Sequence, residues 1–189
     1  MKPKYKHGDY EYFNQKRVRE IIKTIILFAV PLSLFVAGYL ATNTKTNLLT
    51  IVAVLGLLPA SKSCVDMILY LRFHGCSKED HELLKDAMDA FDLKAYGLVF
   101  TSYQRSYEVA GCIVKNGYVC GYLTNHKDMH EDLEKHITQI AKQDGQKATV
   151  AMYEKAEDFL ERIKVLSEKE TENEEKDKNL MTLLYQISL

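Results

Sequence analysis

Hydrophobic residues are concentrated in one stretch of the chain, Thr24 to Leu71, with a mixed polar pattern on either side of it. The first eighteen residues of this stretch, ending at Ala41, contain no charge. As a helix they would extend roughly 27 Å, close to the ~30 Å hydrocarbon core of a bilayer. A short polar break follows, and a second apolar run begins at Leu48. The pattern predicts a transmembrane helical hairpin over residues 24–72, with helices at about 24–41 and 44–71.

The second helix contains two charges, Lys62 and Asp66, and these allow two geometries. In the first, the helix crosses the bilayer as far as Leu71, and the two charges, four residues apart, share a face and pair inside the membrane. In the second, the span ends near Lys62, whose ammonium extends to the cytoplasmic interface. The residues after Lys62 then form an interfacial or linking helix. Both geometries remain open from the sequence.

Positive charge flanks the hairpin on one side only. The basic segment 1–23 precedes the first span, Arg72 and Lys78 follow the second, and the connection between the spans has a single base, Lys45. Because cytoplasmic flanks of membrane helices are enriched in Lys and Arg, we expect both termini in the cytoplasm and the turn outside. The sequence therefore predicts a multi-pass protein of the cell membrane, with the lipid bilayer as its first partner.

Residues 77–167 have the patterning of a small soluble domain. Apolar positions at helical spacing alternate with β-rich runs bounded by turn residues. The predicted fold class is α/β, with a cytoplasmic domain in the order α-β-β-β-α-β-α following the hairpin. A helix between the third and fourth strands implies that these two strands are parallel and the crossover right-handed. The expected elements are a helix at 78–93, strands at 98–103, 107–114, 118–123 and 148–153, and helices near 128–143 and 156–166.

Asn116-Gly117 is the strongest short-range signal in this domain, because this dipeptide favours a type I′ hairpin turn. A two-residue loop there sets Ile113 opposite Cys120 and Cys112 opposite Gly121. Successive side chains in a strand point to opposite faces. Cys112 and Cys120 should therefore lie on opposite sides of the sheet, where they cannot form a disulfide.

Composition narrows the function classes. The net charge is −1 and the pI is near 6.6, which argues against nucleic acid as a partner. The four cysteines have no repeated spacing and indicate reduced thiols.

The end of the chain, residues 168–189, combines a charged linker with an apolar segment whose Leu180, Leu183, Leu184 and Ile187 recur at helical spacing. Docking on the domain and contact with a partner or membrane are both compatible with that stripe.

The α-β-β-β-α-β order, with the Gly-containing hairpin approached by residues Glu108 to Gly117, resembles the core of the restriction-endonuclease-like nucleases, including nuclease-related domains. In that family paired acids hold a divalent metal that activates water. Here the acid expected near Ala110 is missing, and neither acid nor lysine stands at 122–124. The resemblance therefore implies a degenerate copy that does not cut nucleic acid.

Two histidines four residues apart, His126 and His130, could share a helix face and bind a metal; an exposed, solvated face is the alternative. Glu108 is a second weak candidate, with a strand-end surface residue as its alternative. We expect no cofactor and no catalytic set. The predicted function is a non-catalytic partner-binding or regulatory module on a two-span anchor, with an unknown protein partner. The alternatives are a membrane-anchored metal-dependent hydrolase and a homo-oligomeric sensor or effector that uses Lys62 and Asp66.

Overall fold

A computed structural model describes residues 6–102, 105–125 and 130–189. The chain folds as two units. One unit is residues 14–73; the other joins the residues up to 13 with residues 74–189. The predicted boundaries were drawn differently, because the N-terminal segment to residue 23 and the C-terminal segment from 168 were treated as separate from the α/β domain.

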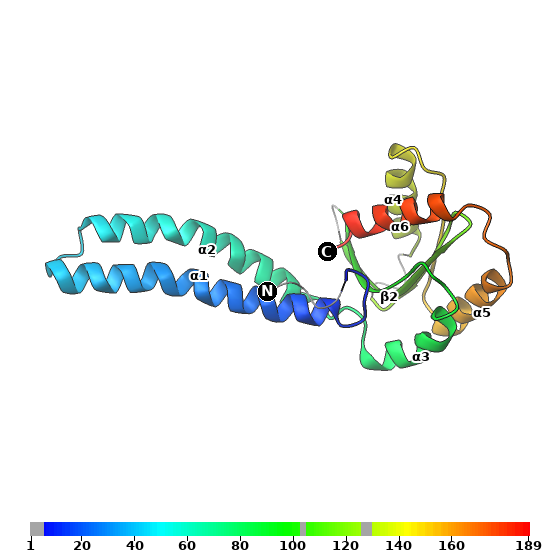
Figure 1. The fold of residues 1–189 in the computed structure, drawn as a ribbon, viewed down its shortest axis with the longest axis horizontal. Coiled ribbons are helices and arrows are strands. Elements are labelled where there is room, and N and C mark those ends of the chain that lie inside the picture. The colour runs from blue at the N-terminus through cyan, green and yellow to red at the C-terminus, as the bar shows by residue number, and fades with distance from the viewer. Residues whose placement is uncertain (1–5, 103–104, 126–129) are drawn as a thin grey trace. The chain divides into compact units, whose positions relative to one another are not determined.

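The first unit is a helical hairpin. Helix α1, Tyr12–Thr42, and helix α2, Leu48–Arg72, run side by side (Figure 1). Both pass through a proline, Pro31 in α1 and Pro59 in α2, without a break in the helix. Helix α1 thus extends further than the expected span of about 24–41, whereas α2 lies close to the expected 44–71. Each helix is long and apolar enough to cross a membrane.

Small side chains let the two helices approach each other. A side chain at Gly56 would come within 3.0 Å of the ring of Pro31, and Ala53 is buried. The turn is held by Asn47, whose side-chain oxygen accepts a 2.8 Å hydrogen bond from the amide of Thr50 and so caps α2. Close contact of small residues is how helices pack within a membrane.

The second unit is a four-stranded sheet with helices on both faces. The strands β1 (Lys94–Thr101), β2 (Ser106–Lys115), β3 (Tyr118–Leu123) and β4 (Thr149–Tyr153) are neighbours in that order. The first three are antiparallel, and β3 and β4 are parallel, as predicted. Helices α4 (His130–Gln143) and α6 (Glu174–Ile187) cover one face, and α3 (Lys78–Met88) and α5 (Ala156–Ser167) cover the other (Figure 1).

The predicted hairpin register is confirmed. Asn116 and Gly117 have φ angles of 52° and 74°, as a type I′ turn requires. Ile113 pairs with Cys120, and Cys112 pairs with Gly121. Cys112 consequently belongs to the core beneath α4 and α6, and Cys120 belongs to the core beneath α3 and α5.

The C-terminal segment docks on its own domain. Helix α6 begins at Glu174, inside the run of charges, and its residues Leu180, Met181, Leu183 and Leu184 are buried in the sheet core. Of the two possibilities for the apolar stripe, docking is therefore confirmed. Ser188 forms an isolated antiparallel β-bridge with Phe100, and the amide of Leu189 donates a hydrogen bond to the carbonyl of Val99. The end of the chain therefore covers the edge of β1.

The N-terminal residues 6–13 also belong to the α/β unit, and we call them the strap. The carbonyl of Gly8 accepts a 2.7 Å hydrogen bond from the amide of Tyr96 on β1. The ring of Tyr10 stacks on His81 at 3.9 Å between centroids, and Phe13 is 3% exposed. These aromatic side chains cover the core of the α/β unit.

Candidate functional site

The outer surface of the hairpin is apolar along the charge-free parts of both helices. Many large side chains there are more than half exposed, among them Ile25 at 61%, Leu32 at 64% and Leu58 at 69%. Only 17% of the most apolar window of each helix is buried inside the protein. Water would oppose such exposure by roughly 25 cal/mol for each Å² of apolar surface, whereas hydrocarbon would not. This surface suits a bilayer.

A polar contact between the two helices marks where the apolar parts end. The hydroxyl of Thr24 on α1 lies 3.0 Å from the carbonyl oxygen of Ser63 on α2 and 2.9 Å from its hydroxyl. Thr24 follows Lys23, the last charge of α1 before the apolar run, and Ser63 follows Lys62, the first charge of α2. The contact therefore sets Lys23 and Lys62 at the same level of the hairpin.

Beyond that level the two helices interact through charged and aromatic groups. The guanidinium of Arg17 donates to the carbonyl oxygens of Tyr70 and Phe73, at 3.2 and 2.9 Å. The ammonium of Lys16 lies 5.6 Å from the centre of the Tyr70 ring. These charge-assisted hydrogen bonds satisfy carbonyls at the end of α2, which have no partner within the helix.

Lys62 and Asp66 lie one turn apart on α2, as predicted. The ion pairs found among the described residues do not include this pair. Lys62 is exposed and Asp66 is half-buried. Lys62 shares its level with Lys23, which is compatible with the geometry in which Lys62 marks the end of the apolar span; the choice between the two geometries stays a prediction.

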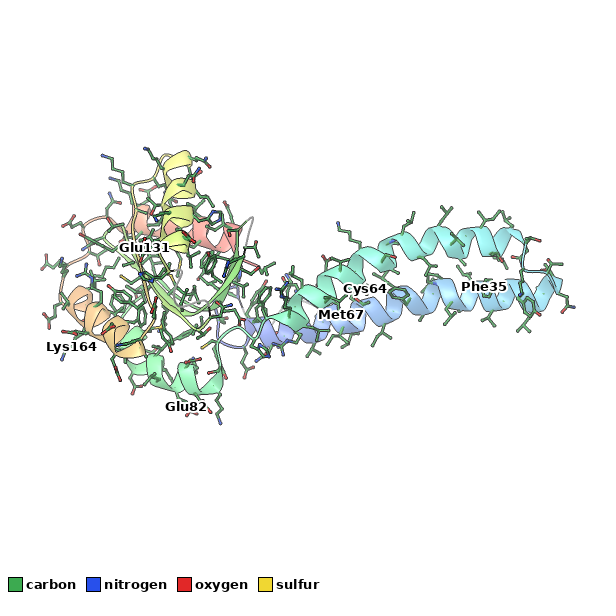
Figure 2. The ribbon with its side chains drawn as sticks, turned by 180° about the vertical axis from the view of Figure 1, so that it is seen from behind. Phe35, Cys64, Met67, Glu82, Glu131 and Lys164 are labelled. Carbon is green, nitrogen blue, oxygen red and sulfur yellow. The ribbon has the colours of Figure 1, made fainter. Side chains whose placement is uncertain are left out.

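An apolar groove of about 720 Å³ runs between the helices across this level, with lining residues on both sides of the Thr24–Ser63 contact. Phe35, Cys64 and Met67, seen along the hairpin in Figure 2, are among the residues that line it. Cys64 is the only one of the four thiols outside the α/β unit, and it is half-buried.

In the α/β unit, Glu108 holds a connection in place. Its carboxylate accepts a 3.1 Å hydrogen bond from the amide of His74, just before α3. Its own amide donates to the side chain of Asn125 at 2.7 Å, and its carbonyl accepts from Thr124. These partners tie the start of β2 to the end of β3. Such contacts support a structural role for this carboxylate.

His130 lies at the start of α4, with its Nδ1 atom 2.7 Å from the carboxylate of Glu154, just after β4. Both side chains are about one-third exposed. The other histidine of the predicted pair, His126, lies outside the described residues. Within those residues, no three His, Cys, Asp or Glu side chains come together as metal ligands would.

A group of polar side chains under the strap was not predicted. Nδ1 of His81 and the hydroxyl of Tyr96 are both buried without a hydrogen-bond partner among the described residues. Burial, with the Lys85 charge as a second cause, lowers the pKa of His81. Burial, with Asp80 as a smaller cause, raises the pKa of the Cys76 thiol to about 12. The environment therefore keeps both groups uncharged and unreactive near neutral pH.

Asp177 on α6 is a second group that sequence reasoning missed. It lies in the run of charges treated as solvated, yet it is 2% exposed. Its two carboxylate oxygens accept hydrogen bonds from the amides of Asn116 and Gly117, at 2.7 and 2.8 Å. A cleft of about 840 Å³ borders this contact, lined by residues of both charge signs. The sequence does contain a signal for this burial. When the apolar stripe of α6 is extended by one turn towards the N-terminus, residue 177 falls on the buried face.

No known protein family, curated protein or solved structure matches this chain. The resemblance to nucleases thus rests on the order of the elements and on one turn, and it stays a prediction.

Proposed function

We propose that this chain is a two-span membrane protein whose α/β unit is a non-catalytic binding or regulatory module on the cytoplasmic side. The Thr24–Ser63 contact carries the first part of this proposal. It makes the charge-free parts of α1 and α2 end at one level, as a planar boundary between hydrocarbon and water demands. Two unrelated core helices of a soluble protein would have no reason to end their apolar surfaces together.

The orientation follows from where the bases lie. Six of them, on both helices, fall between the shared level and the ends of the hairpin that join the α/β unit, whereas the turn at 43–47 has one. Lys and Arg remain on the cytoplasmic side during insertion. The α/β unit is therefore assigned to the cytoplasm.

The chemistry of the α/β unit supports a binding role. Glu108 is engaged by a backbone amide. Burial, the largest influence, raises the pKa of Cys120 to about 11, so its thiol is protonated at neutral pH. Cys120 is thus a poor nucleophile. Functional residues of a binding module would instead lie on its outer surface, where Leu83 on α3 and Val165 on α5 are large apolar side chains that are about half exposed.

Cysteine labelling tests the membrane placement. In a Cys64→Ser background, a thiol introduced as Thr44→Cys should react with a membrane-impermeant maleimide in intact cells. A matched thiol on α5, Lys164→Cys (Figure 2), should react only after the membrane is opened. The protein should also stay with the membranes during alkaline extraction. Release into the supernatant, or labelling of both sites from the same side, contradicts the proposal.

The role of the α/β unit is tested in native membranes by crosslinking. A photo-reactive residue at Val165 should capture a protein partner, and one at the buried Ile163 should capture none. Divalent-metal-dependent cleavage of DNA or RNA by the purified full chain, lost in Glu108→Gln, would establish the hydrolase alternative instead. A changed membrane function in Lys62→Leu, with normal expression, would establish the sensor alternative.

A further inference from the structure

The hairpin has an unusual concentration of positive charge in a narrow zone. Residues 14–23 of α1 and 62–73 of α2 carry six bases and two acids, a net charge of +4, which we call the collar. By contrast, residues 74–189 carry fifteen bases and twenty-two acids. The collar is therefore a local feature and does not reflect a generally basic chain. Its charges are Lys16, Arg17, Arg19, Glu20, Lys23, Lys62, Asp66 and Arg72.

The Thr24–Ser63 contact sets the start of this charge at one level on both helices. Lys23 and Lys62 flank the contact, and the remaining collar charges follow on the side away from the turn. With the apolar surface assigned to hydrocarbon, the collar lies where lipid headgroups begin. A helix rises 1.5 Å per residue, so the segment from Lys23 back to Lys16 covers roughly 10 Å, enough to cross a headgroup layer of roughly 5–8 Å.

Several collar cations are directed outward. Lys62 is exposed, and the side chain of Lys23 is 48% exposed even though its ammonium contacts Glu20 at 2.8 Å. Arg19 is half-buried and lies four residues before Lys23, on the same face of α1. Arg17 and Lys16 are used differently, since they contact carbonyls and a ring of α2. Those two contacts hold the helix ends together and so fix the positions of the outward cations.

We propose that the collar binds anionic phospholipid headgroups, with Arg19, Lys23 and Lys62 as the residues that contact the phosphates. Clusters of Lys and Arg just outside a membrane span are attracted to anionic lipid. Each charge strengthens the binding of anionic over neutral lipid by about fivefold. The inference rests on the proposed membrane placement and adds the chemistry of the lipid that surrounds the protein. The bound lipid would neutralise a positive zone that would otherwise repel itself.

The test uses the full chain in nanodiscs that contain equal amounts of phosphatidylcholine and phosphatidylglycerol. Native mass spectrometry of the released protein gives the ratio of the two lipids that remain bound. We expect enrichment of phosphatidylglycerol, falling about fivefold in Lys62→Gln and by more in Arg19→Gln/Lys23→Gln/Lys62→Gln. The control Lys164→Gln removes an exposed charge from α5 and should leave the ratio unchanged.

A second variant raises the net charge of the collar, so its expected effect is a gain of lipid enrichment and not a loss. Asp66→Asn makes the collar more positive and should increase the enrichment, and added salt should decrease it in every variant. Equal binding of the two lipids, or enrichment that none of the collar variants alters, overturns the proposal. A chain that fails to enter nanodiscs at all would instead overturn the membrane placement, so the two failures are distinguishable.

Discussion

Asp177 is predicted to hold α6 on the sheet through the β2–β3 turn. Its side chain is buried, and each carboxylate oxygen accepts one backbone hydrogen bond, from Asn116 at 2.7 Å and from Gly117 at 2.8 Å. In Asp177→Ala both bonds are lost. In Asp177→Asn the side-chain amide offers only one acceptor, and its NH₂ group faces a second N–H.

The magnitude follows from the kind of bond that is removed. A hydrogen bond to a charged group contributes about 1.5–3 kcal/mol to stability. Asn116 and Gly117 are half-buried, so water partly replaces the lost acceptors. We therefore expect Asp177→Ala to lower the free energy of unfolding of the α/β unit by about 2–4 kcal/mol, and Asp177→Asn by nearly as much, because the donors lose the charge in both cases.

Pulse proteolysis of the full chain in detergent over a urea series measures this quantity, since it reports the folded fraction of the soluble unit. The matched control is Glu175→Ala, which removes an exposed carboxylate two residues away on the same helix. It should change the free energy of unfolding by less than about 0.5 kcal/mol. A similarly small effect of Asp177→Ala would refute the argument that this buried carboxylate stabilises the turn.

Three further predictions concern the α/β unit. Leu184→Ala, at a fully buried position of α6, should cost about 2–5 kcal/mol in the same assay, whereas an effect below 1 kcal/mol would mean that α6 does not contribute to the core. Burial lowers the pKa of His81 below its usual 6.5, so on acidification the unfolded chain takes up a proton before the folded one. The free energy of unfolding should therefore fall as the pH drops below about 6.5. His81→Gln should reduce this dependence of stability on pH, and an unchanged dependence would count against the role of His81. Copper-catalysed oxidation of the intact protein should give no Cys112–Cys120 disulfide, because the two thiols lie in different cores on opposite faces of the sheet; a crosslinked tryptic peptide pair would show that the register is wrong.

The sheet was predictable because its signals are local. Asn116-Gly117 determines a turn by its own backbone preference, the turn determines the register, and the register separates Cys112 from Cys120. The parallel pairing of β3 with β4 follows in the same way from one intervening helix. The two apolar helices were equally evident, since length and the absence of charge suffice.

The features that the sequence did not predict depend on contacts between residues far apart in the chain. No pattern in residues 6–13 predicts that the carbonyl of Gly8 accepts a hydrogen bond from the amide of Tyr96, or that the ring of Tyr10 stacks on His81. Asp177 resembles its solvated neighbours in sequence and differs only in the face of α6 on which it lies. The level of Lys62 was ambiguous for the same reason, because it depends on the contact of the neighbouring Ser63 with Thr24, thirty-nine residues earlier in the chain.

The strap has a consequence for the order in which the chain assembles. The residues that it contacts, Tyr96, His81 and Tyr185, are made only after both helices of the hairpin. The α/β unit is therefore a discontinuous domain that cannot be completed until both helices of the hairpin have been synthesised. A fragment that starts at residue 74 would leave the Tyr96 amide and the His81 ring uncovered. A fragment limited to 77–167 would also lose α6, with its four buried apolar side chains and Asp177. We therefore expect a stable α/β unit to need both the residues before the hairpin and those after it, supplied in one chain or by adding the strap as a peptide.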